Sequence, residues 1–348
     1  MQSLLTSLRS RVTRPGSILI AFGMTLMLLL AACGSSTNTG GPSTNAGGTG
    51  KLTIAFVMGA EADPFFKAMK IGADAEAAAQ GVKLIWQGDP SVYSPATQIP
   101  YVDQVLAQHP SGLVLIPTDP TALQPEVTKA TAMHIPVINV DTHVADLSSV
   151  LSFITGDNTD GGTKAADAMA TAMNYQAGQS YQVVVGLTSA TTTTNVARLT
   201  GFKQEISAKY PGIQIVDVGY SQSQASVANT NVSNWLTKYP HLNGIFAIDG
   251  TNATGAAAAL QAKGLVGKVV LVGYDAYPAN VALLKQGVFT AMIAQDPATE
   301  AKMAIDDFVT YFKQNRSAAG INPMVTIPNV LLTKNTSAAD LQKYTYPS

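Results

Sequence analysis

Cysteine, histidine and net charge are all scarce in this chain, and each shortage excludes a class of protein. The single cysteine among 348 residues excludes a disulfide framework and a cysteine-rich zinc site. The four histidines lie far apart in the sequence and leave little for a histidine-based metal centre. The 21 basic and 22 acidic side chains nearly cancel, so the basic excess typical of a nucleic-acid-binding protein is absent. We therefore expect no metal, no cofactor and no nucleic acid partner.

The remaining composition is that of a packed globular protein. Hydrophobic residues make up 46% of the chain and charged residues 12%, a balance that does not fit intrinsic disorder. A length of 348 residues is enough for two domains of ordinary size. These counts favour a neutral two-domain protein that handles a small molecule.

The N-terminus has the features of an export signal. Arg9, Arg11 and Arg14 precede an apolar run over 18–30, which is shorter than the roughly 20 residues of a membrane-spanning helix. The run ends in Leu-Ala-Ala, and the only cysteine of the chain, Cys33, follows directly. This arrangement resembles the lipobox of bacterial lipoproteins, whose cysteine thiol receives a diacylglycerol.

That resemblance implies a signal peptide and lipobox over 1–33 and lipidation of Cys33. The protein would then be exported and anchored by lipid to the outer face of the cytoplasmic membrane. A plain secretory signal with a chance cysteine, or an uncleaved anchor, is the alternative. The next residues, 34–50, have no charge and many glycines, which predicts a flexible tether.

From residue 51 onward, short apolar segments alternate with longer helical stretches. The predicted strands are 52–58, 82–86, 113–116, 136–140, 150–154, 182–187, 213–218, 244–248, 269–272 and 289–294. The predicted helices are 65–80, 97–108, 123–133, 162–173, 196–209, 225–238, 254–262, 279–285 and 298–312. This alternation predicts parallel sheets with helices on both faces.

The strands are continuously apolar, as in Leu-Val-Leu-Ile over 113–116, which is typical of strands buried on both faces. Ten strands in two similar halves favour an α/β fold of two doubly wound, Rossmann-like lobes. A closed eight-stranded barrel is the structural alternative, and the strand count exceeds it.

Motifs of familiar enzymes are absent from the sequence: there is no nucleophile elbow, zincin helix, Walker loop or dinucleotide fingerprint. The segment from Asp157 to Gly161 has only a partial likeness to a calcium loop, because the closing glutamate is missing. A turn whose aspartate caps the next helix is the preferred interpretation. Paired carboxylates of a carbohydrate hydrolase stay possible.

Polar residues gather directly after the predicted strands, where ligands bind in open parallel sheets. Six segments stand out in order: Asp-Pro-Phe-Phe at 63–66, Pro-Thr-Asp at 117–119, Ile-Pro-Val-Ile-Asn-Val-Asp at 135–141, Arg-Leu-Thr-Gly-Phe at 198–202, Val-Gly-Tyr-Asp at 272–275 and Ile-Ala-Gln at 293–295. Their order and spacing resemble the type I periplasmic binding proteins, closest to the ribose-binding branch of sugar-transport receptors.

The resemblance implies a clamshell of two lobes joined by three hinge crossovers. The N-terminal lobe would comprise 51–155 plus 297–328, and the C-terminal lobe 156–296 plus 329–348. Such a receptor is a monomer without enzymatic activity that binds a monosaccharide between its lobes. It delivers the sugar to an ABC-type membrane permease.

The ligand-binding residues that the resemblance implies are Asp63, Phe65, Phe66, Asp141, Thr142, Arg198, Asp249, Tyr274, Asp275 and Gln295. Carboxylates, an arginine fork and an amide suit sugar hydroxyls, and aromatic rings cover the apolar faces of a sugar. The alternatives are core positions for the two phenylalanines, turn caps for Asp141 and Asp275, and a surface position for Arg198.

Three positions depart from the ribose-type pattern, which has Asn at Asp63, Arg at Thr142 and Asn at Asp249. The predicted site thus loses one positive charge and gains two carboxylates. A polyol with many donors fits this set, and so does an amino sugar, a cationic metabolite or another non-sugar such as an autoinducer. The effector domain of a sugar-responsive repressor has the same fold, but the export signal argues against it.

Overall fold

The structure is a computed structural model that describes residues 51–347. The predicted signal peptide, Cys33 and the predicted tether lie outside the described residues. The described strands are β1 (Thr53–Met58), β2 (Lys83–Gly88), β3 (Gly112–Leu115), β4 (Val137–Val140), β5 (Ser152–Gly156), β6 (Tyr181–Leu187), β7 (Ile213–Tyr220), β8 (Leu242–Ala247), β9 (Val270–Tyr274), β10 (Ala291–Ala294), β11 (Met324–Ile327) and β12 (Val330–Thr333). The described α-helices are α1 (Pro64–Gln80), α2 (Pro95–Leu106), α3 (Gln124–Ala132), α4 (Asn158–Ala172), α5 (Thr193–Lys209), α6 (Ala225–Lys238), α7 (Gly250–Ala262), α8 (Pro278–Lys285), α9 (Pro297–Lys313) and α10 (Ala338–Tyr344).

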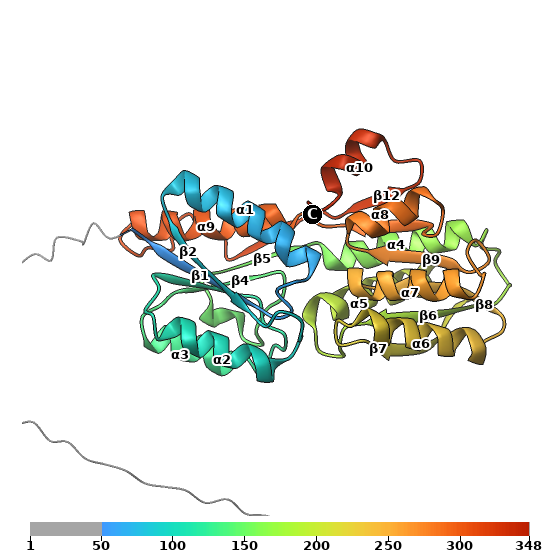
Figure 1. Cartoon of the computed structure of the whole chain (residues 1–348), viewed down its shortest axis with the longest axis horizontal. Helices are drawn as coiled ribbons and strands as arrows, with labels where there is room; N and C mark the ends of the chain where they lie inside the picture. The colour runs from blue at the N-terminus through green and yellow to red at the C-terminus, as the bar shows by residue number, and fades with distance from the viewer. Residues whose placement is uncertain (1–50, 348) are drawn as a thin grey trace, which may run out of the picture. The chain divides into compact units, whose positions relative to one another are not determined.

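The strands form two six-stranded sheets with the same internal order (Figure 1). The first sheet runs β11-β5-β4-β3-β1-β2 and the second runs β12-β10-β9-β8-β6-β7. All recorded pairings are parallel except that of β12 with β10, which is antiparallel. The chain therefore builds the same lobe twice, and the predicted α/β fold of two doubly wound lobes is confirmed.

Both faces of the first sheet are buried, which explains its continuously apolar strands. Figure 1 shows α1 and α9 on one face and α2 and α3 on the other. In β1, Phe56 belongs to the core cluster that includes Met69 of α1, whereas Val57 belongs to the cluster that includes Val102 of α2. Alternate residues of one strand thus pack against helices on opposite faces.

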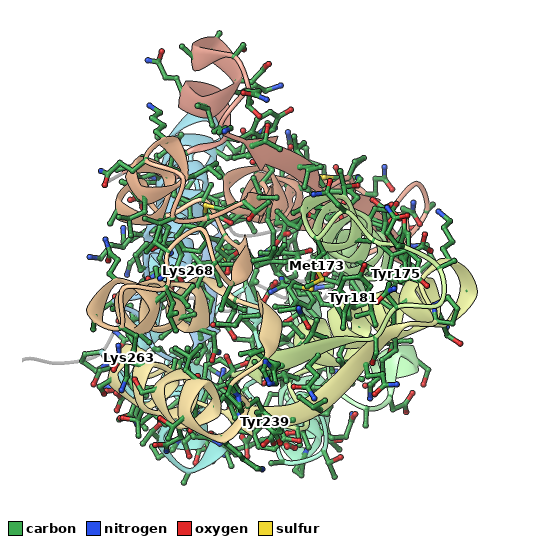
Figure 2. All side chains as sticks on the ribbon, turned by 90° about the vertical axis from the view of Figure 1, so that its right-hand side faces the viewer. Met173, Tyr175, Tyr181, Tyr239, Lys263 and Lys268 are labelled. Atoms are coloured by element: carbon green, nitrogen blue, oxygen red, sulfur yellow. The ribbon has the colours of Figure 1, made fainter. Side chains whose placement is uncertain are left out.

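The strands bring their carboxyl ends together between the two lobes. Figure 2 looks at the opposite end of the second sheet. The residues labelled there precede or begin strands: Met173, Tyr175, Tyr181, Tyr239, Lys263 and Lys268. The loops that follow the strands are therefore the ones that face the other lobe, as expected for a ligand site in parallel sheets.

The structure adds four elements that the sequence interpretation did not contain: β11, β12, α10 and a short 3-10 helix at Leu147–Ser149. Both strands have only four residues and are partly exposed, so neither carries the fully apolar pattern of the central strands. Edge strands of this kind give a weak periodic signal. The lobe boundaries expected from the sequence stay a prediction. The chain passes from the first sheet to the second between β11 and β12, which are separated by Pro328 and Asn329.

Several helices begin a few residues earlier than predicted, and for α4 the residue that precedes the helix explains why. α4 starts at Asn158 rather than 162, because the Asp157 carboxylate accepts a hydrogen bond from the Asp160 N–H, 3.0 Å away. This is the N-cap arrangement that satisfies a free N–H in the first turn. The capping interpretation of Asp157 is therefore confirmed.

Two kinds of feature are missing from residues 51–347. Within this part of the chain, no helix is both long and apolar enough to cross a membrane. Nor do the described residues hold any group of three or more histidine, cysteine, aspartate or glutamate side chains placed to bind a metal ion.

Candidate functional site

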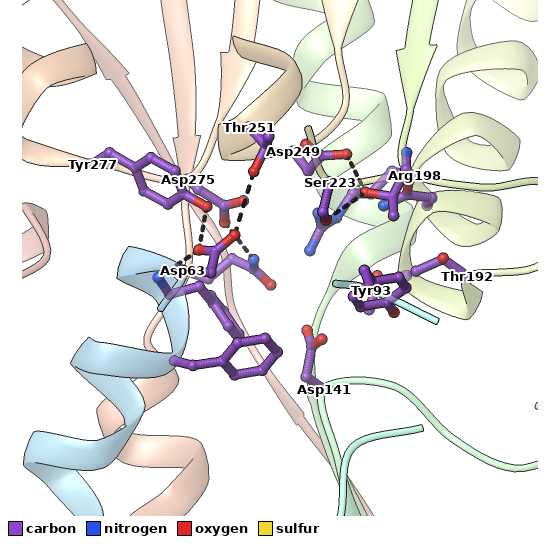
Figure 3. A pocket seen from close by; sticks show the side chains of 16 residues that line it. Asp63, Tyr93, Asp141, Thr192, Arg198, Ser223, Asp249, Thr251, Asp275 and Tyr277 are labelled. Atoms are coloured by element: carbon purple, nitrogen blue, oxygen red, sulfur yellow. Dashed lines mark hydrogen bonds between the residues drawn. The ribbon is translucent and has the colours of Figure 1, made fainter. Parts of the chain in front are cut away.

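A cavity lies between the carboxyl ends of the two sheets, and we call it the cleft cavity (Figure 3). Residues of both lobes line it: Asp63, Phe65, Phe66, Tyr93, Asp141, Thr188, Thr192, Thr194, Asn195, Arg198, Ser223, Asp249, Thr251, Asp275, Tyr277 and Gln295. Four carboxylates and one guanidinium therefore face the same small space.

Asp141 and Asp275 occupy equivalent places in the two lobes. Asp141 directly follows β4 and Asp275 directly follows β9, with φ angles of +60° and +64°. Their N–H groups donate to Ile154 and Ile293, each at 2.8 Å, on the neighbouring strand. A left-handed backbone is costly for a residue other than glycine and is found preferentially at functional sites. The repeated fold thus projects one aspartate from each lobe toward the cleft cavity.

Arg198 is buried between helices and carboxylates, with 2% of its surface exposed. Its Nε donates to Asn158 Oδ1 at 2.7 Å and its Nη1 to the Ile248 carbonyl at 3.0 Å. Its guanidinium carbon lies 3.8 Å from the centre of the Tyr274 ring, within cation–π distance. These contacts fix the fork in one orientation before any ligand binds.

Two glycines allow α4 and α5 to approach closely enough to place Arg198. A Cβ atom at Gly162 would lie 2.0 Å from the Arg198 carbonyl oxygen. A Cβ atom at Gly201 would lie 1.9 Å from the Thr159 carbonyl oxygen. Any larger residue at either position would push the helices apart and move the guanidinium away from Asn158.

Three of the four carboxylates are already held by donors of the protein itself. Asp275 accepts from the Gly250 N–H at 2.8 Å, from Gln295 Nε2 at 2.6 Å and from the Tyr346 hydroxyl at 3.1 Å. Asp249 caps α7 and accepts from the Thr188 hydroxyl and from the N–H and side-chain amide of Asn252, each at 2.8 Å. Burial nevertheless raises the pKa of Asp249.

The third of these carboxylates, Asp63, connects the two lobes (Figure 3). It accepts from the Phe65 N–H at 2.9 Å, from the Tyr277 hydroxyl, and from the Thr251 hydroxyl at 3.3 Å. Asp63 precedes α1 of the first lobe, whereas the two hydroxyls belong to the second. Burial raises the pKa of Asp63 to about 6, although the bonds from Tyr277 and Phe65 act in the opposite direction. Asp63 is therefore a contact between lobes in this conformation.

Asp141 differs from the other three carboxylates. Among residues 51–347, no donor reaches its buried Oδ1 atom. Burial raises its pKa to about 7; Arg198 lowers it, and the negative charges of Asp275 and Asp63 raise it further. A buried acceptor without a partner is costly, so Asp141 gains most from a ligand that donates a hydrogen bond.

Aromatic rings form one wall of the cleft cavity. Phe65 and Phe66, at the start of α1, are each 6% exposed and pack edge to face with ring centres 5.4 Å apart. Tyr93, from the loop between β2 and α2, also lines the cavity. This wall offers apolar faces opposite the carboxylates and Arg198.

Eight of the ten residues predicted from the sequence line the cleft cavity, and two do not. Thr142 is 1% exposed and its hydroxyl donates to the Pro117 carbonyl at 2.8 Å, which turns the side chain into the protein. Tyr274 is fully buried beneath Arg198, and its hydroxyl accepts from Asn329 Nδ2 at 2.6 Å. In this structure, Tyr274 supports the arginine rather than covering a ligand.

Several lining residues were not predicted: Tyr93, Thr188, Thr192, Thr194, Asn195, Ser223, Thr251 and Tyr277. The polar run after β6, which contains four of them, is a visible signal because it follows a buried strand. Tyr277 stands two positions after Asp275. Tyr93 has no such signal, since it lies in a loop whose course depends on tertiary packing.

Comparison with known proteins places the chain in a family. The periplasmic binding protein domain matches residues 54–315. The chain belongs to this family. The D-ribose/D-allose-binding protein of Pseudomonas aeruginosa is 30% identical over 262 residues, which are 73% of this chain and 80% of that protein. The ribose import binding protein RbsB of Salmonella typhimurium is 32% identical over 255 residues, 73% of this chain and 82% of the relative.

Solved structures agree with the sequence comparison. An ABC transporter solute binding protein from Agrobacterium vitis, bound with alpha-D-tagatopyranose, superposes with a TM-score of 0.79 at 30% identity. The match covers 86% of this chain and 100% of that protein. These periplasmic binding proteins are named for the solutes they bind, and the present chain is likewise a solute-binding protein and not an enzyme.

Proposed function

We propose that this protein captures a small neutral carbohydrate in the cleft cavity and delivers it to an ABC importer. The observation that carries this proposal is the buried, unpartnered Oδ1 of Asp141, which faces Arg198 and an aromatic wall across the cavity. A sugar brings hydroxyl donors for the carboxylate, acceptors for the guanidinium and C–H faces for the rings. The relatives that bind ribose, allose and tagatose support this ligand class.

The bonding of the other carboxylates favours a neutral ligand over a cationic one. Asp63, Asp249 and Asp275 have internal donors, and the pKa of Asp141 is raised to about 7. The acid-rich set thus exposes little uncompensated negative charge to a ligand. Asp141 alone would be left to pair with a buried cation, and the Arg198 guanidinium already acts on that carboxylate.

Hinged closure over the ligand is the second part of the proposal. We take 51–155 plus 297–328 as one lobe and 156–296 plus 329–348 as the other. Direct contacts already join them: Asp63 accepts from Tyr277 and Thr251, and the His143 N–H donates to the Thr193 hydroxyl at 3.3 Å. A ligand that touches both lobes adds to these contacts and so favours the closed state.

A thermal-shift titration of the full chain tests the ligand class. D-ribose, D-allose, D-tagatose and D-arabinose are the probes, and L-ribose controls for general solute effects. A sugar at 100 times its dissociation constant adds about 2.7 kcal/mol of stability, which raises the melting temperature by about 5 °C. Stabilisation by putrescine but by none of the sugars would contradict the proposal.

Anchoring by lipid at Cys33 is the third part of the proposal, carried by the sequence Leu-Ala-Ala-Cys at the end of the apolar run. Cys33→Ser is expected to abolish lipid attachment, so that the chain leaves the membrane fraction or stays unprocessed. Mass spectrometry of the wild-type N-terminal peptide checks this directly. An unmodified Cys33 in protein taken from membranes rules the anchor out.

A further inference from the structure

The C-terminal segment of the described chain returns to the cleft between the lobes. We call residues 337–347 the C-terminal strap. α10 begins after Ser337, whose side chain accepts from the Asp340 N–H, and Leu341 packs into the main core cluster at 4% exposure. Figure 1 places the end of the chain between the start of α1 and the second lobe. The strap is therefore a packed part of the fold.

Tyr346 attaches the C-terminal strap to the loop that carries Asp275. Its N–H donates to the Ala276 carbonyl at 2.9 Å, and its hydroxyl donates to Asp275 Oδ1 at 3.1 Å. The side chain is 4% exposed. Gln295 Nε2 donates to the same oxygen, so Tyr346 and Gln295 together fix the plane of the carboxylate.

The ring of Tyr346 contacts aromatic residues that line the cleft cavity from both lobes. Its centre lies 6.1 Å from that of Phe65, at an interplanar angle of 64°, and 6.0 Å from that of Tyr277. Phe65 lies in α1 of the first lobe, and Tyr277 follows β9 in the second. Both line the cleft cavity, whereas Tyr346 stands behind them.

We propose that Tyr346 is a positioning residue for ligand binding and that the C-terminal strap holds it where the two lobes meet. Its hydroxyl orients Asp275, and its ring supports the aromatic wall at Phe65. In the proposed function, on which this inference rests, Asp275 then presents the remaining lone pair of its Oδ2 to a sugar hydroxyl without reorganisation when the cleft closes.

The test compares Tyr346→Phe, which removes only the hydroxyl, with Tyr344→Phe, which removes a hydroxyl from the same strap outside the cleft cavity. Each full-chain variant is titrated calorimetrically with D-ribose, D-allose, D-tagatose and D-arabinose. Tyr346→Phe is expected to weaken binding about tenfold, because a hydrogen bond to a charged group is lost. Tyr344→Phe is expected to bind like the wild type.

A double-mutant cycle separates positioning from a structural role. In an Asp275→Asn background, Tyr346→Phe is expected to cost little further affinity, because both changes act on the same contact. The ligand-free melting temperature of Tyr346→Phe should stay close to that of the wild type. Unchanged affinity, or a loss that does not depend on Asp275, overturns the inference.

If none of the four sugars binds the wild type, that result contradicts the proposed function but does not test the role of Tyr346. Amide hydrogen exchange of the ligand-free protein then tests that role. The Gly250 amide, which donates to Asp275 Oδ2, and the first turn of α1 are then expected to exchange faster in Tyr346→Phe. Faster exchange confined to the C-terminal strap means that Tyr346 serves the strap alone and overturns the positioning role.

Discussion

Arg198→Met is expected to abolish ligand binding and to destabilise the fold by about 3–5 kcal/mol, the range for removing one partner from a buried charge cluster. Methionine keeps much of the side-chain length but loses the bonds to Asn158 and Ile248. The negative charges of Asp141, Asp275 and Asp249 would then share the buried space without a nearby cation. In the wild type, the Arg198 guanidinium lowers the pKa of Asp141.

Urea denaturation and calorimetry on the same variant measure the two effects separately. Arg316→Met is the matched control, because Arg316 is the other arginine after residue 51 and lies at the surface. It is expected to change stability by less than about 0.5 kcal/mol. If Arg198→Met retained wild-type affinity, the guanidinium would have no place in the ligand site.

Lowering the pH from 8 to 5 is expected to stabilise the ligand-free protein, because burial raises the pKa of several carboxyl groups in the fold, among them Asp141, Glu300 and Asp63. The pKa of Asp141 is raised from 3.8 to about 7 in the folded state, so the folded chain binds this proton more tightly than the unfolded chain. The free energy of unfolding therefore falls as pH rises through about 7 and increases as pH drops. Asp141 alone contributes about 3 kcal/mol over this window.

Ligand affinity is expected to change in the opposite direction. A sugar hydroxyl donates to the ionised form of Asp141, so binding tightens as pH rises through about 7 and releases a proton. Calorimetry in two buffers of different ionisation enthalpy detects that proton. Asp141→Asn should remove the pH dependence of ligand affinity and reduce that of stability, whereas Asp74→Asn, at an exposed ion pair with Lys70, should leave both profiles in place. A proton release that persists in Asp141→Asn assigns the effect to another group.

The sequence determined the fold class and the edge on which the site lies. Continuously apolar strands such as β3 require cover on both faces, and their alternation with helices leaves parallel sheets as the arrangement. Polar residues directly after β4 and β9 then meet at one edge, which is how Asp141 and Asp275 were found. These inferences depend only on local patterns, which are present in the order of residues.

Only the tertiary structure decided which of the predicted side chains are available to a ligand. Tyr277 lies 214 positions from Asp63, and Tyr346 lies 71 positions from Asp275, yet both occupy carboxylate oxygens. Because these tyrosines come from distant segments, no local sequence pattern distinguishes Asp63 and Asp275 from Asp141. The Oδ1 atom of Asp141 has no donor within residues 51–347. Hydrogen-bond satisfaction is a property of the packed chain, and it turns a set of four similar aspartates into three held groups and one open acceptor.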